Sequence, residues 1–78
     1  MITIEEKVIA VLTDELRYKD GIIEPSMNLK EDLDVQSLDA LEILIALEDK
    51  LKIVYPEDTH EHIYTVQDLI TLTQKLVK

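Results

Sequence analysis

Cysteine is absent from this 78-residue chain, and so are tryptophan and phenylalanine. Without cysteine, a disulfide framework and thiolate metal ligands are excluded, which fits a reducing compartment. The chain also lacks an apolar run of 18 residues and a recognisable signal peptide, so we expect a cytoplasmic protein that neither crosses a membrane nor leaves the cell. There is a single glycine, Gly21, and we expect it to be the only residue that tolerates a positive φ comfortably.

Basic residues are scarce, with eight Lys and Arg against 17 Asp and Glu, which gives a net charge of −9. Nucleic acids and anionic membranes are polyanions, so this charge argues against both as partners and favours proteins with basic patches. The imbalance is strongest between residues 31 and 49, where no Lys or Arg occurs. The acids in this stretch are Glu31, Asp32, Asp34, Asp39, Glu42, Glu48 and Asp49.

Apolar residues make up 46% of the chain and are mostly Leu, Ile and Val, which predicts a globular fold. The length predicts one domain, residues 1–78, with a small core. The first helix is predicted to begin at a capping box, Thr3 to Glu6, and to end near Tyr18. Its apolar stripe, spaced by three and four residues, consists of Ile4, Val8, Val11, Leu12 and Leu16.

Residues 19–36 contain Pro25 and have no sustained period, so they predict a long loop. We expect an ordered crossover, because its apolar residues can pin it across the helices. These residues are Ile22, Ile23, Met27, Leu29 and Leu33.

A second helix is predicted from about Leu38 to Lys52, with Ser37 as its N-cap. A helical wheel places Ala40, Ile43, Leu44, Leu47 and Leu51 on the core side and Asp39, Glu42 and Asp49 on the opposite side. Leu38, Leu41 and Ile45 fall between the two groups, with Glu48 nearby. An apolar arc wider than a core requires, edged by carboxylates, predicts a docking surface.

A short third helix is predicted near Glu57 to Ile63, because Tyr55-Pro56 interrupts the second helix and acids follow. The last helix is predicted to begin at Thr65 to Asp68, a second capping-box pattern. Its predicted buried side consists of Val66, Leu69, Ile70, Leu72, Leu76 and Val77. The predicted fold class is therefore all-α: a small four-helix bundle of three longer helices and one short helix, with a long first loop.

Several chemistries are excluded by spacing. No base is placed beside Ser37 as a hydrolase would need, because His60 and His62 belong to another element and their spacing of two does not share a helix face. We interpret both histidines as surface residues. An EF-hand beginning at Asp32 would have Ser37 in place of its glycine and Ile43 in place of its final glutamate, and no zinc spacing occurs, so we expect no metal site.

The segment Leu33-Asp34-Val35-Gln36-Ser37-Leu38-Asp39, followed by the acidic helix and by Ile53 to Asp58, resembles the acyl carrier proteins. In that family the core motif is Leu-Gly-x-Asp-Ser-Leu, and its serine carries a 4′-phosphopantetheine arm. The sequence departs from the motif twice. Asp34 stands where the family has glycine, and Gln36 stands where it has aspartate.

The resemblance implies a monomeric carrier without catalytic activity of its own. 4′-Phosphopantetheine would be attached covalently to Ser37 by a phosphopantetheinyl transferase, and would hold acyl groups as thioesters for fatty-acid or related acyl biosynthesis. Acyl synthases or transferases with basic patches would bind the second helix, through Leu38, Asp39, Leu41, Glu42, Ile45, Glu48 and Asp49. Two alternatives remain open: a carrier for an amino acid or a specialised acyl group, and an unmodified acidic adaptor in which Ser37 is only an N-cap.

Overall fold

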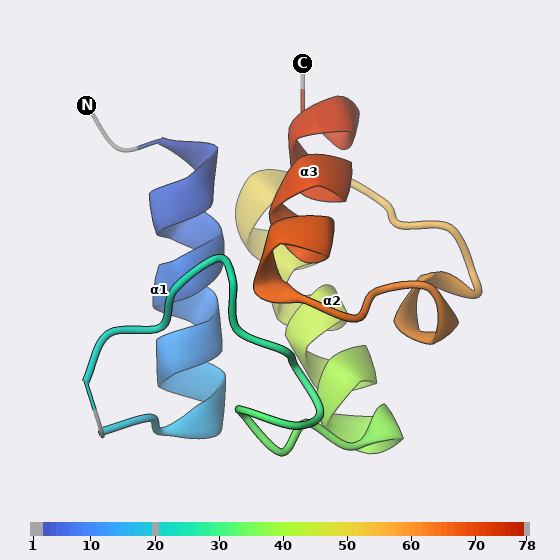
Figure 1. The fold of residues 1–78 in the computed structure, drawn as a ribbon. Helices are drawn as coiled ribbons and strands as arrows, with labels where there is room; N and C mark the ends of the chain where they lie inside the picture. The colour runs from blue at the N-terminus through green and yellow to red at the C-terminus, as the bar shows by residue number, and fades with distance from the viewer. Residues whose placement is uncertain (1–2, 20, 78) are drawn as a thin grey trace.

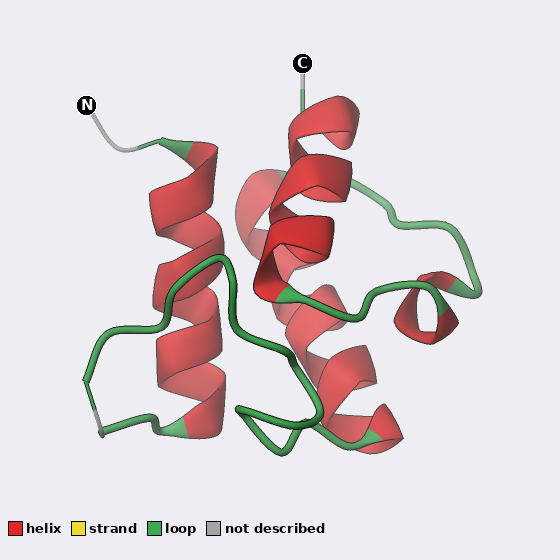
Figure 2. Cartoon of the chain, viewed as in Figure 1, coloured by secondary structure: helices red, strands yellow, loops and turns green. Residues whose placement is uncertain are grey.

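Three α-helices and one short 3-10 turn form the fold in the computed structural model, which describes residues 3–19 and 21–77. In chain order they are α1 (Ile4–Leu16), α2 (Ser37–Leu51), the turn η1 (Thr59–Glu61) and α3 (Val66–Leu76). The described residues contain no β-strand, only an isolated bridge between Asn28 and Thr65 (Figure 2). The all-α prediction is confirmed, and the short helix predicted over residues 57–63 is a single 3-10 turn.

The α1 helix begins where the sequence predicted and ends slightly earlier. Thr3 Oγ1 accepts a hydrogen bond from the Glu6 N–H at 3.1 Å, which confirms Thr3 as the N-cap. After Leu16, Arg17 adopts a left-handed conformation with φ 51°, and the next N–H, of Tyr18, donates to the Thr13 carbonyl at 3.0 Å. These bonds satisfy carbonyl groups at the end of the helix and offset the steric cost of the conformation. Arg17, Asp34 and Lys52 all have positive φ, so the expectation that only Gly21 (φ 134°) would do so is wrong.

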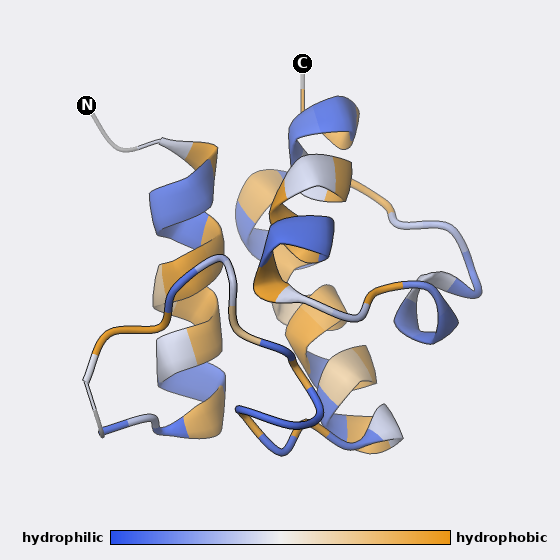
Figure 3. Cartoon of the chain, in the orientation of Figure 1, coloured by the Kyte–Doolittle hydropathy of each residue, from blue (hydrophilic) through white to orange (hydrophobic). Residues whose placement is uncertain are grey.

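The core lies between the three α-helices and beneath the α1–α2 connection. Figure 1 shows α1 and α3 standing side by side, with α2 behind α3 and the connection passing in front. When the chain is coloured by hydropathy, the hydrophobic sides of the helices face one another (Figure 3). The buried apolar residues of the helices are Val8, Val11, Leu12, Ala40, Ile43, Leu44, Leu47, Val66, Leu69 and Ile70. The wheel therefore identified the core face of α2, although Leu51 at its end is only half-buried.

The described residues of the α1–α2 connection pack across the helices, as expected, but not every apolar side chain contributes to this packing. Ile23, Leu29 and Leu33 are buried and Met27 is half-buried. Ile22 is 80% exposed, so its predicted packing is wrong: adjacent residues in an extended segment point to opposite sides, and Ile23 takes the inward position. The Leu29 N–H donates to the Tyr64 carbonyl at 2.9 Å and the Val66 N–H to the Met27 carbonyl at 3.0 Å, which joins the connection to the start of α3.

Tyr55 links the segment after α2 to α2 itself and to α3. Its N–H donates to Glu48 Oε2 at 2.7 Å, and its hydroxyl lies 2.6 Å from Thr73 Oγ1. Because the Thr73 hydroxyl donates to the Leu69 carbonyl at 2.7 Å, the Tyr55 hydroxyl is the donor to Thr73. Burial raises the pKa of the Tyr55 hydroxyl, which keeps it a neutral donor.

The α3 helix begins at the capping box that the sequence predicted. Thr65 Oγ1 accepts from the Asp68 N–H at 3.0 Å, and Asp68 Oδ2 accepts from the N–H groups of Thr65 and Tyr64, each at 3.0 Å. These backbone hydrogen bonds lower the pKa of the Asp68 carboxyl.

We expect Asp68→Ala to lower the melting temperature by several degrees at neutral pH, because two backbone donors lose their acceptor. A carboxyl group whose pKa is depressed by folding stabilises the fold above its unfolded pKa and stops doing so as it becomes protonated. The difference from wild type should therefore shrink below about pH 4. Thermal melts by circular dichroism between neutral pH and acid measure it, with Gln74→Ala, an exposed change later in α3, as the control. A difference that stays constant through the acid range would contradict the role of the ionised carboxylate.

Candidate functional site

Ser37 is the first residue of α2 and is exposed, and it is not the helix cap. The N-cap is Gln36, whose φ and ψ are extended and whose carbonyl accepts the Ala40 N–H at 2.9 Å. Asp39 Oδ2 accepts from the Gln36 N–H at 3.0 Å, so a carboxylate one turn into the helix closes its start. The predicted N-cap role of Ser37 is therefore wrong by one residue. Within the described part of the chain, the Ser37 hydroxyl makes no hydrogen bond, which leaves it available for chemistry.

The loop before Ser37 is fixed by hydrogen bonds centred on Asn28. Asn28 Oδ1 accepts from the N–H groups of Lys30 at 2.9 Å and Glu31 at 2.8 Å, and the Asn28 N–H donates to Asp32 Oδ2 at 2.7 Å. The Val35 N–H then donates to the Leu29 carbonyl at 2.8 Å. The segment that leads into α2 is thus a hydrogen-bonded turn that fixes the start of the helix.

Asp34 shows what the first departure from the family motif means structurally. Its φ of 53° lies in the left-handed region, where glycine is most comfortable and aspartate is among the better tolerated alternatives. Its Oδ1 accepts from Gln36 Nε2 at 3.0 Å, so the two departing residues contact each other. The backbone shape that glycine would favour is present here with a different residue.

We expect Asp34→Gly to change the free energy of unfolding by less than about 0.5 kcal/mol, since relief of strain is offset by the greater freedom of glycine in the unfolded chain. Asp34→Val should lower it by about 1–2 kcal/mol, because a β-branched residue is poorly accommodated at this φ. Urea denaturation measures both. Glu31→Val, at an exposed position without a positive φ, is the control, and equal losses in the two valine variants would contradict the explanation.

A cavity of about 330 Å³ opens beside Ser37. Residues 28–31 and 35–37, Ala40 of α2 and residues 60, 61, 63 and 64 surround it, so three separate segments meet here. Among them is His60, which is half-buried and whose Nδ1 is hidden from solvent without a hydrogen-bond partner in residues 3–19 and 21–77. The prediction of a surface histidine is wrong for His60, because the turn η1 folds back toward the start of α2. No pattern in the sequence places His60 near Ser37.

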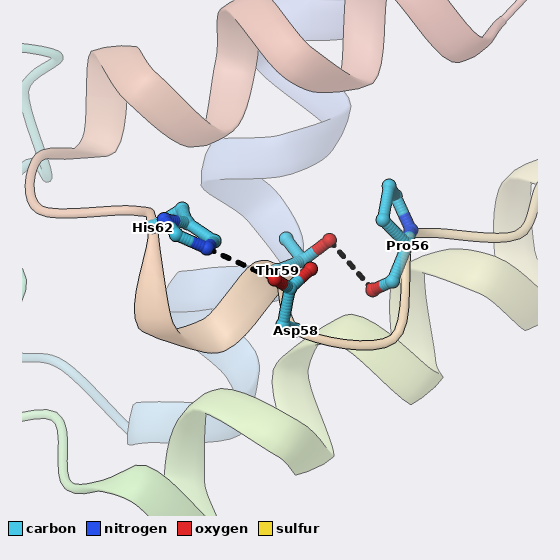
Figure 4. A network of polar contacts seen from close by, with 4 residues as sticks. All are labelled: Pro56, Asp58, Thr59 and His62. Atoms are coloured by element: carbon cyan, nitrogen blue, oxygen red, sulfur yellow. Dashed lines mark hydrogen bonds and ion pairs between the residues drawn. The ribbon is translucent and has the colours of Figure 1, made fainter.

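His62 is the surface histidine that the sequence predicted. Its Nε2 lies 3.0 Å from Asp58 Oδ2, and both side chains are well exposed (Figure 4). Thr59 Oγ1 donates to the Pro56 carbonyl at 2.7 Å, also drawn in Figure 4. The hydrogen bond from His62 lowers the pKa of the Asp58 carboxyl. Together these contacts hold η1 in its turn and so position His60.

The exposed side of α2 combines apolar and acidic side chains, as the wheel predicted. Leu38 and Ile45 are 67% and 63% exposed, and Leu41 lies between them at 39%. Glu42 and Asp49 are exposed, and no hydrogen bond to either side chain occurs within the described residues. Asp39 and Glu48 differ, since each accepts a backbone hydrogen bond, from Gln36 and Tyr55 respectively.

Residues 3–19 and 21–77 contain neither a metal-binding cluster nor a membrane-spanning helix. No group of three or more His, Asp or Glu side chains is arranged to hold a metal ion. No helix in this part of the chain is long and apolar enough to cross a membrane.

The fold and the site together define a carrier-type domain: a small helical bundle that presents an exposed serine at the start of its second helix. The residues present fit a covalent phosphopantetheine, because the Ser37 hydroxyl is accessible, makes no hydrogen bond to the residues that the structure describes, and adjoins a cavity. A model of the family described as "Phosphopantetheine attachment site" matches residues 6–73. The chain belongs to this family, that of the acyl carrier proteins, and its cofactor is covalently bound 4′-phosphopantetheine.

Solved structures agree with this assignment. The chain is similar to a protein described as an acyl carrier protein from Mycobacterium tuberculosis, with 29% identity and a TM-score of 0.86 over 94% of this chain and 97% of the other. It also shares the fold of an acyl carrier protein from Thermotoga maritima, with 20% identity and a TM-score of 0.76 over 90% of this chain and 81% of the other. Carrier domains of this type are not catalysts; they interact with phosphopantetheinyl transferases and acyl-handling enzymes.

Proposed function

We propose that Ser37 is the attachment residue and that the chain carries acyl intermediates of fatty-acid or related acyl biosynthesis without catalysing a reaction. The bound arm supplies a terminal thiol that holds an acyl group as a thioester. The protein supplies the anchor, a folded helix start, and a surface for partner enzymes. A tether raises the effective concentration of its cargo at each enzyme that docks, which is the physical advantage of a carrier.

The main support for this proposal is that helix capping and the candidate attachment site fall on different residues at the start of α2. Gln36 and Asp39 cap the helix, so the neighbouring Ser37 hydroxyl is not needed for folding. The only other serine, Ser26, is exposed in the α1–α2 connection next to Pro25 and lies outside the motif. Ser37 is therefore the serine with a structural setting suited to modification.

The exposed side of α2 supports the partner-binding part of the proposal. Leu38, Leu41 and Ile45 offer apolar contact area next to Ser37, and Glu42 and Asp49 add charge without a hydrogen-bond partner among the described residues. Such a surface suits enzymes with basic patches, because charge attracts the partner and apolar side chains then bury area. Asp39 and Glu48 contribute negative potential from fixed positions.

The test is modification of the purified protein by coenzyme A and a broad-specificity phosphopantetheinyl transferase. Intact mass should rise by one phosphopantetheine, and fragmentation should place the added mass on the peptide that contains Ser37. Subsequent loading should give a thioester that hydroxylamine cleaves. A protein whose mass is unchanged by any transferase tried would instead support the unmodified acidic adaptor, and loading restricted to aminoacyl groups would support the amino-acid carrier.

A further inference from the structure

The C-terminal ends of α2 and α3 lie together, at the end of the bundle away from Ser37 (Figure 1). No Asp or Glu occurs in residues 50–56 or 69–77, although the chain contains 17 acids. These two segments contain three lysines at the helix ends, together with apolar residues that line a shared groove. We call this surface the basic end, and it consists of Lys50, Leu51, Lys52, Ile53, Val54, Lys75, Leu76 and Val77.

The lysines of the basic end are exposed and make no ion pair within the part of the chain that the structure describes. The ion pair found there joins His62 and Asp58 instead. Lys50 and Lys75 occupy the last turns of their helices, and Lys52 is the C-cap of α2. Cations at helix C-termini complement the helix dipole, so the position of the lysines alone requires no partner. The dipole does not explain the apolar surface beside them.

An apolar groove of about 360 Å³ lies at the basic end. Its apolar side chains are partly accessible, and Val54 is 79% exposed. The half-buried members are Leu51, Ile53, Leu76 and Val77. Among the described residues that line the groove, Lys52 alone is charged. Interfaces between proteins combine an apolar centre with a polar rim, so this surface has the composition of an interface.

The charge of the basic end decides between kinds of partner. A second copy of the chain carries a net charge of −9, so two copies repel each other over most of their surface. An anionic membrane repels the chain for the same reason. The first turn of α1, with Glu5 and Glu6, lies toward the same end, which confines the positive surface to the side formed by α2 and α3 (Figure 1). A protein partner fits best, because it needs carboxylates only where it touches this side.

We propose that the basic end binds a segment of a second protein in which carboxylates flank apolar side chains, as on an acidic amphipathic helix. The apolar side chains enter the groove, and the carboxylates meet Lys50, Lys52 and Lys75. The 15 residues of α2 span ~22 Å, so a partner at the basic end leaves Ser37 and the first turn of α2 open. Such a partner holds the carrier in place while enzymes act at the other end. The inference goes beyond the carrier function and does not depend on attachment at Ser37.

The test uses two synthetic helical peptides that differ only in charge. One has Leu at spacings of three and four residues with Glu at the flanking positions, and the other has Lys in place of each Glu. Each is titrated into isotope-labelled apo protein, and the backbone amide signals are followed by NMR. We expect the Glu peptide to shift the signals of residues 52–54 and 75–77, and the Lys peptide to leave them unchanged. Holo protein should bind the Glu peptide as tightly as apo protein.

Lys50→Glu with Lys75→Glu should weaken binding of the Glu peptide about tenfold or more at low salt. The matched control is Lys19→Glu with Lys30→Glu, which makes the same change in net charge at exposed positions of the α1–α2 connection. Its affinity should stay within about twofold of wild type, because charges far from the contact are screened. Val54→Ser removes apolar area without changing charge and should weaken binding severalfold.

The outcomes separate this proposal from its alternatives. A wild-type titration without shifts at the basic end overturns it, whether or not the variants fold. Equal weakening in the two double variants overturns the assigned surface, and equal binding of both peptides overturns the acidic partner. Sedimentation of the protein alone and flotation with anionic vesicles test the other occupants. Self-association or vesicle binding that Lys50→Glu with Lys75→Glu abolishes would assign the basic end to that occupant instead. Failure of attachment at Ser37 would remove the carrier function and leave the peptide result unchanged.

Discussion

Ser37→Ala should abolish phosphopantetheine attachment completely while leaving the melting temperature within about 2 °C of wild type. The chemical loss follows because alanine has no hydroxyl to form the phosphodiester. The unchanged stability follows because Gln36 and Asp39, not Ser37, close the start of α2, and alanine is well tolerated in a first helical turn. Intact mass after incubation with coenzyme A and transferase measures the first effect, and a thermal melt measures the second.

Two comparisons make this result specific. Ser26→Ala removes the other serine and should be modified to the same extent as wild type. Asp39→Ala removes the carboxylate that accepts the Gln36 N–H, so it should lower the melting temperature although Ser37 remains. Modification that survives in Ser37→Ala would place the arm elsewhere, and a large loss of stability in that variant would return the capping role to Ser37.

Reversal of two charges on α2, Glu42→Lys with Asp49→Lys, should reduce the association rate with a partner enzyme about tenfold or more at low salt. Both side chains are exposed and make no hydrogen bond within the described residues, so the effect should fall on docking rather than on folding. The difference should narrow as salt rises, because screening acts over about 10 Å at 0.1 M ionic strength. Stopped-flow or surface-binding kinetics with the transferase measure it.

The matched control is Glu15→Lys with Asp14→Lys, two exposed acids of α1 that make the same change in net charge on a different helix. Equal losses of association rate in the two double variants would mean that net charge alone matters and that α2 is not the docking helix. Glu48 is unsuitable for this experiment. Its carboxylate accepts the Tyr55 N–H at 2.7 Å, so its reversal would disturb the fold as well.

The features that the sequence predicted correctly depend on local chemistry. The caps at Thr3 and Thr65 follow from a hydroxyl placed three residues before an acid, and the core face of α2 follows from helical periodicity. The same helical wheel predicted the polar side of α2 and the exposure of Leu38 and Ile45. The motif around Ser37 indicates this residue as the candidate for attachment, and that assignment stays a prediction.

The features that were missed depend on contacts between distant segments or on competition between neighbours. Gln36 rather than Ser37 is the N-cap, because Asp39 accepts a hydrogen bond from the Gln36 N–H. N-cap propensity alone does not distinguish between these two adjacent residues. Thr73 is fully buried in α3 because Tyr55, eighteen residues earlier, bonds to it. The position of His60 beside Ser37 depends on how η1 packs against α2, which periodicity in a three-residue turn cannot show.

The four acids on α2 differ in their structural roles, and this difference bears on how the protein can change in evolution. Replacing Asp39 or Glu48 with a side chain that cannot accept a hydrogen bond leaves a backbone N–H without its acceptor, so we expect such changes to destabilise the fold. Glu42 and Asp49 are exposed and accept no hydrogen bond within the described residues, so we expect the fold to tolerate substitutions there. If α2 is the docking helix, as we propose, substitution at these two surface positions, about one and three helical turns beyond the serine, would adapt the same bundle to a different enzyme.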